Sequence, residues 1–253
     1  MRFASKVAVV TGAGSGFGEA IAKRFANEGA EVVAADIDPD RGKRVVEQID
    51  ADGGRAIFVE TDVSKGADIK RMFDACVDAF GGVDIIVNNA GFSHRIAPLW
   101  EIAEEDYDRV FATNTKSVYL AAVHGVPLLR KRGGGSIINT ASIGAVRPRA
   151  NVTAYNATKG AVVTLTRGLA IELGPDRIRV NAVNPLASET GFIKNVLGTD
   201  KFPDAVRESM IREVPLGRLA QPSDVASAVL FLASDDAAFI TGIALGVDGG
   251  RSI

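Results

Sequence analysis

The chain has 253 residues, of which 47 % are hydrophobic and 24 % are charged, which is enough apolar material for one large core. Its formal net charge of −2 creates no overall field that would favour nucleic acid or an anionic membrane, so we expect neither as a partner. The single cysteine, Cys76, excludes an internal disulfide framework and fits a reducing compartment.

Short apolar runs alternate with amphipathic stretches from the first residues onward. Strands are predicted over 6–12, 31–37, 55–64, 83–91, 135–142, 178–185 and 242–250, and helices over 17–29, 39–53, 66–82, 104–131, 153–176 and 222–234. Strands of this kind, buried on both faces and separated by helices, indicate a parallel sheet that is covered on both sides. The predicted fold class is therefore α/β, with a single doubly wound parallel sheet of about seven strands across residues 1–253.

Neither a secretory signal nor a membrane helix is predicted. The apolar strand before Gly12 is too short for a signal peptide. No run approaches the roughly 18 apolar residues that a membrane helix needs. We therefore expect a soluble, cytoplasmic protein.

Glycines cluster where the first strand turns into the first helix, in the sequence "VVTGAGSGFGEA". Glycine permits a tight turn and close approach to a pyrophosphate, while the helix N-terminus offers free N–H donors. Asp36 ends the second strand, where a carboxylate can bind the adenosine ribose. We predict a dinucleotide site whose loop contacts are Gly12, Ser15, Gly16, Phe17 and Gly18.

Asp36 also predicts which dinucleotide binds. A carboxylate there would repel the 2′-phosphate of NADP, and its neighbours Ala35 and Ile37 are uncharged, as is Ser15 in the loop. No arginine or lysine stands beside it in the sequence. The expected cofactor is NAD(H), with Asp36 and Ile37 at the adenosine ribose.

The segment "AYNATKG" sets Tyr155 and Lys159 four residues apart, about one helical turn, so their side chains should share one helix face. A free tyrosine, with a pKa near 10, is a poor base at neutral pH. A nearby ammonium and the positive nicotinamide ring would lower this pKa and prepare Tyr155 for proton transfer. The alternative is an amphipathic surface pair without chemistry.

Several motifs together resemble the short-chain dehydrogenase/reductase family over the whole chain. They are T-G-x-x-x-G-x-G at 11–18, "NNAG" at 88–91, Asn114, Ser142, Y-x-x-x-K at 155–159 and "DGG" at 248–250. The resemblance implies that Tyr155 is the general acid/base and that Lys159 lowers its pKa and holds the nicotinamide ribose. It also implies that Ser142 positions the substrate oxygen and that Asn114 holds a water in a proton relay.

The same resemblance implies further cofactor contacts at the ends of other strands. These are Asp62, Val63, Asn89, Ala90, Gly91, Pro185, Leu186, Ser188 and Thr190, and Tyr155 and Lys159 are expected to contact the cofactor as well. Asp62 has the alternative role of capping the next turn. Leu186 stands where the family usually has glycine; because leucine avoids positive φ, the local backbone is expected to differ there.

Substrate contacts are the least specific part of the prediction. Residues 186–214 lie where relatives carry a substrate lid, with a surface insertion as the alternative. Tentative contacts are Ser142, His94, Arg149, Leu186 and Phe192. Arg147 and Arg149 are suited to clamp a carboxylate or phosphate, or they lie at a subunit contact or in solvent. His124, the only other histidine, is distant from His94, so we expect no metal site.

The expected activity is an NAD(H)-dependent oxidoreductase that interconverts a secondary alcohol and a ketone. A polyol, sugar or hydroxy acid dehydrogenase is one form of it. An alternative is a reductase of 3-oxoacyl groups on acyl carrier protein, a branch that usually prefers NADPH, against which Asp36 argues. A non-catalytic NAD-binding sensor is a further alternative. The resemblance also implies a homotetramer.

Overall fold

The computed structural model describes residues 1–199 and 201–253, and its seven strands form one parallel sheet. The strands are β1 (Val7–Thr11), β2 (Glu31–Asp36), β3 (Arg55–Glu60), β4 (Ile85–Asn88), β5 (Gly135–Thr140), β6 (Ile178–Pro185) and β7 (Ala244–Val247). Their order in the sheet is β3-β2-β1-β4-β5-β6-β7. The predicted fold class is confirmed.

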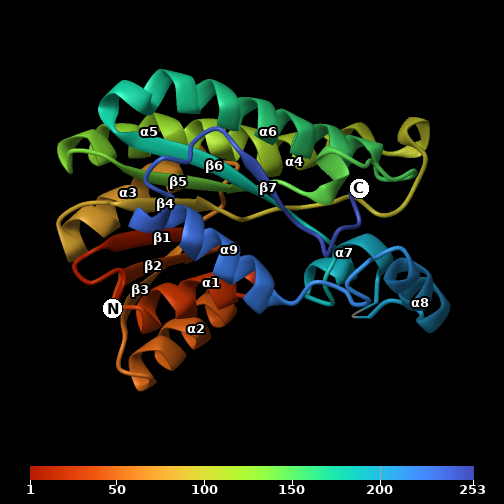
Figure 1. Cartoon of the computed structure of the whole chain (residues 1–253), viewed down its shortest axis with the longest axis horizontal. Helices are drawn as coiled ribbons and strands as arrows, with labels where there is room; N and C mark the ends of the chain where they lie inside the picture. Colours follow the sequence, from red (N-terminus) through yellow and green to blue (C-terminus); the bar gives the residue numbers. More distant parts are fainter. Residues whose placement is uncertain (200) are drawn as a thin grey trace.

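Helices cover both faces of the sheet, as Figure 1 shows. One layer contains α1 (Gly16–Asn27), α2 (Pro39–Ala51) and α9 (Pro222–Ala233), and the other contains α3 (Gly66–Phe80), α4 (Glu104–Phe111), α5 (Ser117–Lys131) and α6 (Thr153–Leu173). Successive strand residues serve opposite layers: Val10 packs with the first, and Val9 with the second. None of the described helices is long and apolar enough to cross a membrane.

All strands except β6 are shorter than predicted, and in β3 and β4 the last predicted residues turn away to make other hydrogen bonds. β3 ends at Glu60 and not at residue 64, since the Asp62 carboxylate accepts a hydrogen bond from the Ser64 N–H (3.0 Å). β4 ends at Asn88, because the next two N–H groups donate to Thr11 Oγ1. Both departures lie at the carboxyl edge of the sheet, where ligands bind in open parallel sheets.

The helix predicted over 104–131 is interrupted, which corrects that prediction. Residues Ala112–Lys116 form a π-helical turn between α4 and α5, and Asn114 lies in its middle. The widened turn is stabilised by tertiary hydrogen bonds from the Asn114 side chain, which periodicity in the sequence does not reveal. Such π turns are frequent at functional sites.

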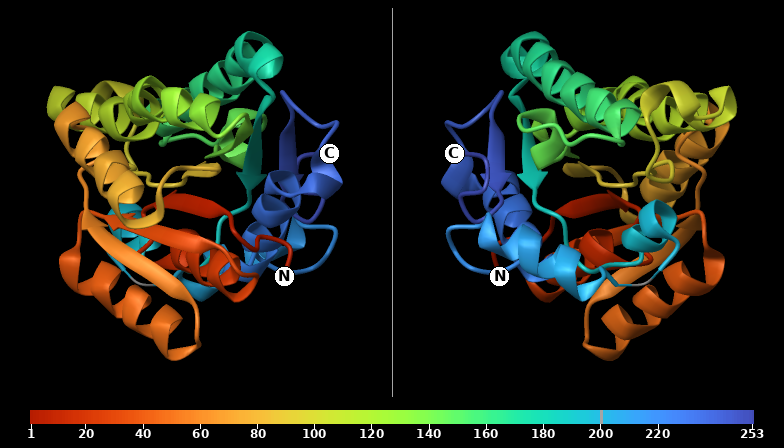
Figure 2. Two further views of the ribbon diagram at one scale, coloured as in Figure 1. Left: turned by 90° about the vertical axis from the view of Figure 1, so that its left-hand side faces the viewer. Right: turned by 90° about the vertical axis from the view of Figure 1, so that its right-hand side faces the viewer.

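The predicted lid contains two short helices, α7 (Phe192–Leu197) and α8 (Asp204–Arg212). Asp200, within the predicted range, lies outside the described residues. Both helices lie at the end of the sheet opposite the N-terminus in Figure 1, and the right-hand view of Figure 2 looks onto them. They share one apolar cluster, formed by Ile143, Leu186, Ile193, Phe202, Met210, Val214 and Leu219.

The strand order reverses between β1 and β4, which are neighbours in the sheet although β2 and β3 separate them in the chain. Chains leaving adjacent strands at such a point diverge and leave a crevice at the carboxyl edge. The glycine loop follows β1 and the "NNAG" segment follows β4, so the fold places the two motifs on opposite sides of one crevice.

Candidate active site

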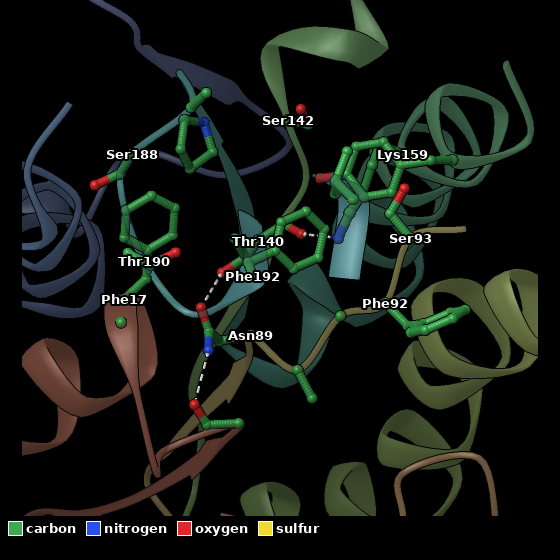
Figure 3. A pocket seen from close by; sticks show the side chains of 18 of the residues that line it. Phe17, Asn89, Phe92, Ser93, Thr140, Ser142, Lys159, Ser188, Thr190 and Phe192 are labelled. Carbon is green, nitrogen blue, oxygen red and sulfur yellow. Dashed lines mark hydrogen bonds between the residues drawn. The ribbon is translucent and has the colours of Figure 1, made fainter. Parts of the chain in front are cut away.

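A cavity of about 510 Å³ opens at this carboxyl edge, and most of the predicted site residues line it. On its wall lie Gly12, Ser15, Gly16, Phe17, Asp36, Ile37, Asp62, Val63, Asn89, Ala90, Gly91, Ser142, Arg149, Tyr155, Lys159, Pro185, Leu186, Ser188, Thr190 and Phe192. Gly18, His94 and Asn114 do not lie on the wall. Figure 3 shows Ser188, Thr190 and Phe17 on one side of the cavity and Lys159, Ser93 and Phe92 on the other.

Two glycines give the loop its close approach to neighbouring segments. Gly12 has φ +65°, and a Cβ there would lie 2.9 Å from the Cα of Ala90. Gly16 has φ +58°, and its Cβ would lie 3.1 Å from that of Thr190. Side chains at either position would be strained and would close the cradle between the two motifs.

Gly18 has a packing role, and its contact with the cofactor stays a prediction. A Cβ at this position would lie 2.0 Å from the carbonyl oxygen of Gly12, so only glycine lets the first turn of α1 sit against the loop. The same turn leaves its N–H groups available, because the Ser15 side chain does not cap the helix. Free donors at a helix N-terminus are what a pyrophosphate needs.

Thr11 fastens the "NNAG" segment to β1. Its Oγ1 accepts hydrogen bonds from the backbone N–H groups of Asn89 (3.0 Å) and Ala90 (3.1 Å). The Asn89 side chain donates in return to the Thr11 carbonyl (3.0 Å). Thr140 Oγ1 on β5 also donates to Asn89 Oδ1 (3.4 Å), as Figure 3 shows. Three strand ends are thereby held in fixed relation around the cavity.

Asp36 lies at the far end of the cavity with both carboxylate oxygens engaged. Oδ2 accepts from the Gly14 N–H (2.7 Å), and Oδ1 accepts from the Asp38 N–H (3.0 Å). No arginine is adjacent to Asp36 in the sequence, but the fold brings one to the same cavity. Arg41, on the first turn of α2, lines the same cavity and pairs with Asp38 (3.0 Å).

Asp62 caps the next turn and also lines the cavity. Its Oδ1 accepts hydrogen bonds from the N–H and hydroxyl of Ser64. Partial burial alone would raise the pKa of the Asp62 carboxyl, but the hydrogen bonds from Ser64 and Lys65 outweigh it and lower the pKa. The carboxylate is therefore held ionised beside the cavity.

Three of the predicted catalytic residues meet on one wall of the cavity. Tyr155 and Lys159 lie one turn apart on α6, and the Lys159 Nζ is 5.7 Å from the centre of the Tyr155 ring. Nζ donates to the Thr140 carbonyl (2.8 Å), which fixes the buried ammonium against β5. Ser142 follows β5, and its Oγ accepts a hydrogen bond from the Gly144 N–H (3.0 Å), which leaves the hydroxyl proton free to donate.

Burial is the main influence on the pKa values of Lys159 and Tyr155. It lowers the pKa of the Lys159 ammonium to about 8. It also raises the pKa of the Tyr155 phenol, although the Ser142 hydroxyl and the charge of Arg149 act in the opposite direction. The predicted lowering of the phenol pKa is therefore wrong for the chain by itself, because desolvation outweighs its polar neighbours.

Asn114 lies behind the wall and not on it. Its Oδ1 accepts from the Phe92 N–H (2.8 Å), while its Nδ2 donates to the Phe92 carbonyl (2.9 Å) and to Thr158 Oγ1 (3.0 Å). The amide thus connects the π turn, the segment after β4 and α6. Its side-chain geometry makes it a positioning residue for Phe92 and Ser93, which do line the cavity.

His94 is corrected as a substrate contact. The side chain is buried, and its Nδ1 lies 2.6 Å from the Arg95 carbonyl oxygen. The ring is turned into the protein, so Ser93 takes its place on the cavity wall. By contrast, both Arg147 and Arg149 line the cavity.

Leu186 adopts no positive φ, in agreement with the expectation for leucine at that position. It is 3 % exposed, donates its N–H to the Val247 carbonyl (3.0 Å) and packs in the lid cluster. Four residues on, Thr190 lies over Gly16. Leucine therefore adds apolar wall where glycine would leave space.

Sequence reasoning missed several residues on the wall. Arg41, Arg109, Thr140 and Arg251 are the chemically distinctive ones. Thr140 binds Lys159 through its backbone carbonyl, which the identity of the side chain does not reveal. Arg251 lies 104 positions from Arg147 in the sequence, although the Arg147 side chain donates to the Arg251 carbonyl. Arg41 was detectable, since a residue on the first turn after Asp36 returns to the end of β2.

Comparisons with known proteins agree with this geometry. A family model described as enoyl-(acyl carrier protein) reductase matches residues 12–252. A 4-formylbenzenesulfonate dehydrogenase from Comamonas testosteroni is 45 % identical over the full length of both chains. A 2,5-dichloro-2,5-cyclohexadiene-1,4-diol dehydrogenase from Sphingobium indicum is 39 % identical, over 100 % of this chain and 98 % of its own.

A crystal structure of a 3-ketoacyl-(acyl-carrier-protein) reductase from Brucella melitensis, complexed with NADH, superposes with a TM-score of 0.92. It is 45 % identical and covers 99 % of this chain and 100 % of its own. The predicted oxidoreductase class is confirmed by these matches. The chain belongs to the short-chain dehydrogenase/reductase family.

Proposed function

We propose that the chain catalyses NAD(H)-dependent interconversion of a secondary alcohol and its ketone. The observation that carries the proposal is the meeting of Ser142, Tyr155 and Lys159 on a cavity that extends to Asp36. A proton-transfer group at one end and a ribose-binding carboxylate at the other are what hydride transfer to a dinucleotide requires.

The residues present fit NAD(H). The cradle between Gly12 and Ala90 would be filled by any side chain at position 12, and the α1 N-terminus keeps its donors free for the pyrophosphate. Asp36 would hold the adenosine ribose, and Lys159 the nicotinamide ribose. When bound, the nicotinamide ring accepts hydride from the substrate carbon or returns it.

Tyr155 supplies the matching proton step. In oxidation its phenolate takes the hydroxyl proton as hydride leaves the carbon, and in reduction the phenol returns that proton to the carbonyl oxygen. Ser142 donates its free hydroxyl proton to the same oxygen, since its lone pair already accepts from Gly144. Lys159 lowers the cost of the phenolate through its charge, held in place by the Thr140 carbonyl.

Reduction of 3-oxoacyl thioesters is the second candidate, and one observation favours it. The Brucella melitensis reductase, named for that chemistry, was solved with NADH. We expected Asp36 to argue against acyl reductases because these usually prefer NADPH. Since this reductase was solved with NADH, the cofactor preference does not distinguish the two candidates. Aldehydes are also candidate substrates, because the Comamonas testosteroni relative is named for one.

Initial rates of NAD⁺ and NADP⁺ reduction test the proposal. The panel contains secondary alcohols, polyols, hydroxy acids, 3-hydroxyacyl thioesters and aromatic aldehydes. NADH formation with one of the alcohol classes supports the proposal and names that class, whereas NADH formation with the aldehydes alone would contradict it in favour of aldehyde oxidation. NADH binding without turnover of any class would favour the sensor instead.

A homotetramer and a cytoplasmic location are part of the same proposal. The tetramer rests on the family resemblance of the whole chain, and the location on the single cysteine, which fits a reducing compartment. The assembly has a physical reason, because apolar side chains such as Ile171 and Phe239 are exposed on the isolated chain.

A further inference from the structure

The two ends of the cavity differ in charge. Asp36 and Asp62 lie at the end that the adenosine would occupy, and they are the only carboxylates among the described residues of the wall. Arg147, Arg149 and Arg251 lie on the wall at the Tyr155 end. Arg149 is placed there by its electrostatic effect on Tyr155 and by Asn156, the residue after Tyr155, whose Nδ2 donates to the Arg149 carbonyl (2.8 Å).

The three arginines are incompletely neutralised. Glu213 Oε2 is shared, at 2.5 Å from Arg251 Nη2 and 3.4 Å from Arg147 Nη2. Arg149 forms no ion pair with any residue in the ranges 1–199 and 201–253. One carboxylate against three guanidinium groups leaves a positive site beside the proposed proton-transfer residue.

One donor in this group has no acceptor. The Nε of Arg251 is buried, and it has no hydrogen-bond partner among the residues that the structure describes; the whole side chain is 14 % exposed. Buried N–H groups are normally paired, so the Arg251 guanidinium, which lines the cavity, keeps unused donor capacity. Guanidinium groups bind planar oxyanions through two parallel hydrogen bonds, so a carboxylate or sulfonate suits the site.

The wall between Tyr155 and these arginines is apolar. It is formed by Ile143, Leu186, Phe192, Ile193, Phe202 and Met210. The Phe192 ring lies 5.7 Å from that of Tyr155. If a substrate extends from Tyr155 to the arginines, the part of it that lies between them contacts this apolar wall and should itself be apolar, either aliphatic or aromatic.

We propose that Arg149, with Arg147 and Arg251, forms an oxyanion-binding subsite, so that the substrate is an alcohol or ketone with an apolar body ending in an oxyanion. This inference rests on the proposed function and narrows its substrate class. Arg149 is the central member, because Asn156 on α6 holds its backbone carbonyl beside Tyr155 and its guanidinium has no described carboxylate partner.

Titration of the NADH-bound protein with four matched ketones tests the subsite. They are para-acetylbenzoate, para-acetylbenzenesulfonate, para-acetylphenyl phosphate and the neutral methyl ester of the first. We expect at least one anion to bind about tenfold or more tightly than the ester. The best of the three anions identifies the oxyanion chemistry that the subsite accepts.

Arg149→Gln is the diagnostic variant, and Arg95→Gln, at an exposed position off the wall, is the matched control. Arg149→Gln should weaken anion binding about tenfold more than it weakens ester binding, while NADH binding verifies the fold. Arg95→Gln should change neither. Equal loss for both ligand types, ester binding as tight as that of every anion, or no anion binding would overturn the subsite.

NADH oxidation in the same mixtures tests the proposed function separately. If the unaltered protein oxidises no NADH with any ketone, the reaction proposed for these substrates fails. The titration still tests the oxyanion subsite in that case, because it measures binding and does not require turnover.

Discussion

At the scale of single residues, burial sets the protonation of the two side chains that are proposed to carry out the proton step. Burial raises the pKa of Tyr155 and lowers that of Lys159, while the Ser142 hydroxyl and the charge of Arg149 act on Tyr155 in favour of the phenolate. A tyrosine in this setting needs its polar neighbours to act as a base near neutral pH. The serine therefore affects the proton step twice, through the substrate oxygen and through the phenol.

Ser142→Ala should shift the pH dependence of alcohol oxidation. The phenolate is the base, so kcat/KM rises with pH as Tyr155 loses its proton. Removing the hydroxyl removes an influence that lowers this pKa, so the rise should move to higher pH, with a lower rate at neutral pH. Profiles of kcat/KM for both proteins check this, and an unmoved or more acidic midpoint would contradict it.

Asp36→Ser should raise the preference for NADP⁺ over NAD⁺ by roughly tenfold to a hundredfold, because like charges in contact cost several kcal/mol. Arg41 lines the cavity beside this position and can pair with a 2′-phosphate once the carboxylate is gone. The double variant with Arg41→Gln should lose most of that gain. An unchanged ratio of kcat/KM values would show that Asp36 does not set the preference.

At the scale of elements, close packing at strand ends positions the cofactor loop. Gly18 brings the first turn of α1 onto the Gly12 carbonyl, and Thr11 ties the end of β1 to the segment after β4. The π turn performs a similar task on the other side, where Asn114 holds Phe92. These contacts are local, so a glycine-to-alanine substitution, which adds one methyl group, can test them.

Gly18→Ala should weaken NADH binding and lower the free energy of unfolding, since the new Cβ would lie 2.0 Å from a backbone oxygen. Gly168→Ala is the matched control. This glycine is exposed within α6, with nothing within 4 Å of its added Cβ, and should stabilise the protein by up to about 1 kcal/mol. Denaturant unfolding and NADH titration of both variants measure the contrast, which equal effects would contradict.

At the scale of the whole molecule, exposed apolar side chains remain outside the two cores. Ile171 is 81 % exposed and Phe239 is fully exposed. Gly242 packs near Ala170, since its added Cβ would lie 3.5 Å from that of Ala170, which brings the C-terminal segment beside this face of α6. A surface of this kind is typical of a subunit contact.

Light scattering after size-exclusion chromatography should give four times the mass of one chain. Ile171→Asp should reduce that mass, because a buried unpaired carboxylate destabilises an interface. The control Val123→Asp alters an exposed apolar residue on α5 and lets the two faces be compared. A single-chain mass for the unaltered protein would contradict the predicted assembly.

The order of strands and helices was predictable because each apolar run is short and is followed by an amphipathic stretch or a turn. The motif residues were predictable because chemistry fixes their spacing, as at Tyr155 and Lys159. Other features depend on tertiary contacts: the π turn at Asn114 and the inward rotation of His94 have no local signal. The raised pKa of Tyr155 likewise reflects burial that appears only when α6 packs against the sheet.

The measurement that tests the central claim most directly is a comparison of Tyr155→Phe with the unaltered protein, with the best alcohol of the panel. We predict that kcat falls by about 10²–10⁴-fold while NADH binding is retained, because the change removes the proton-transfer group and leaves the other cofactor contacts in place. Turnover by Tyr155→Phe within a few fold of the unaltered rate would contradict the assignment of Tyr155 as the acid/base.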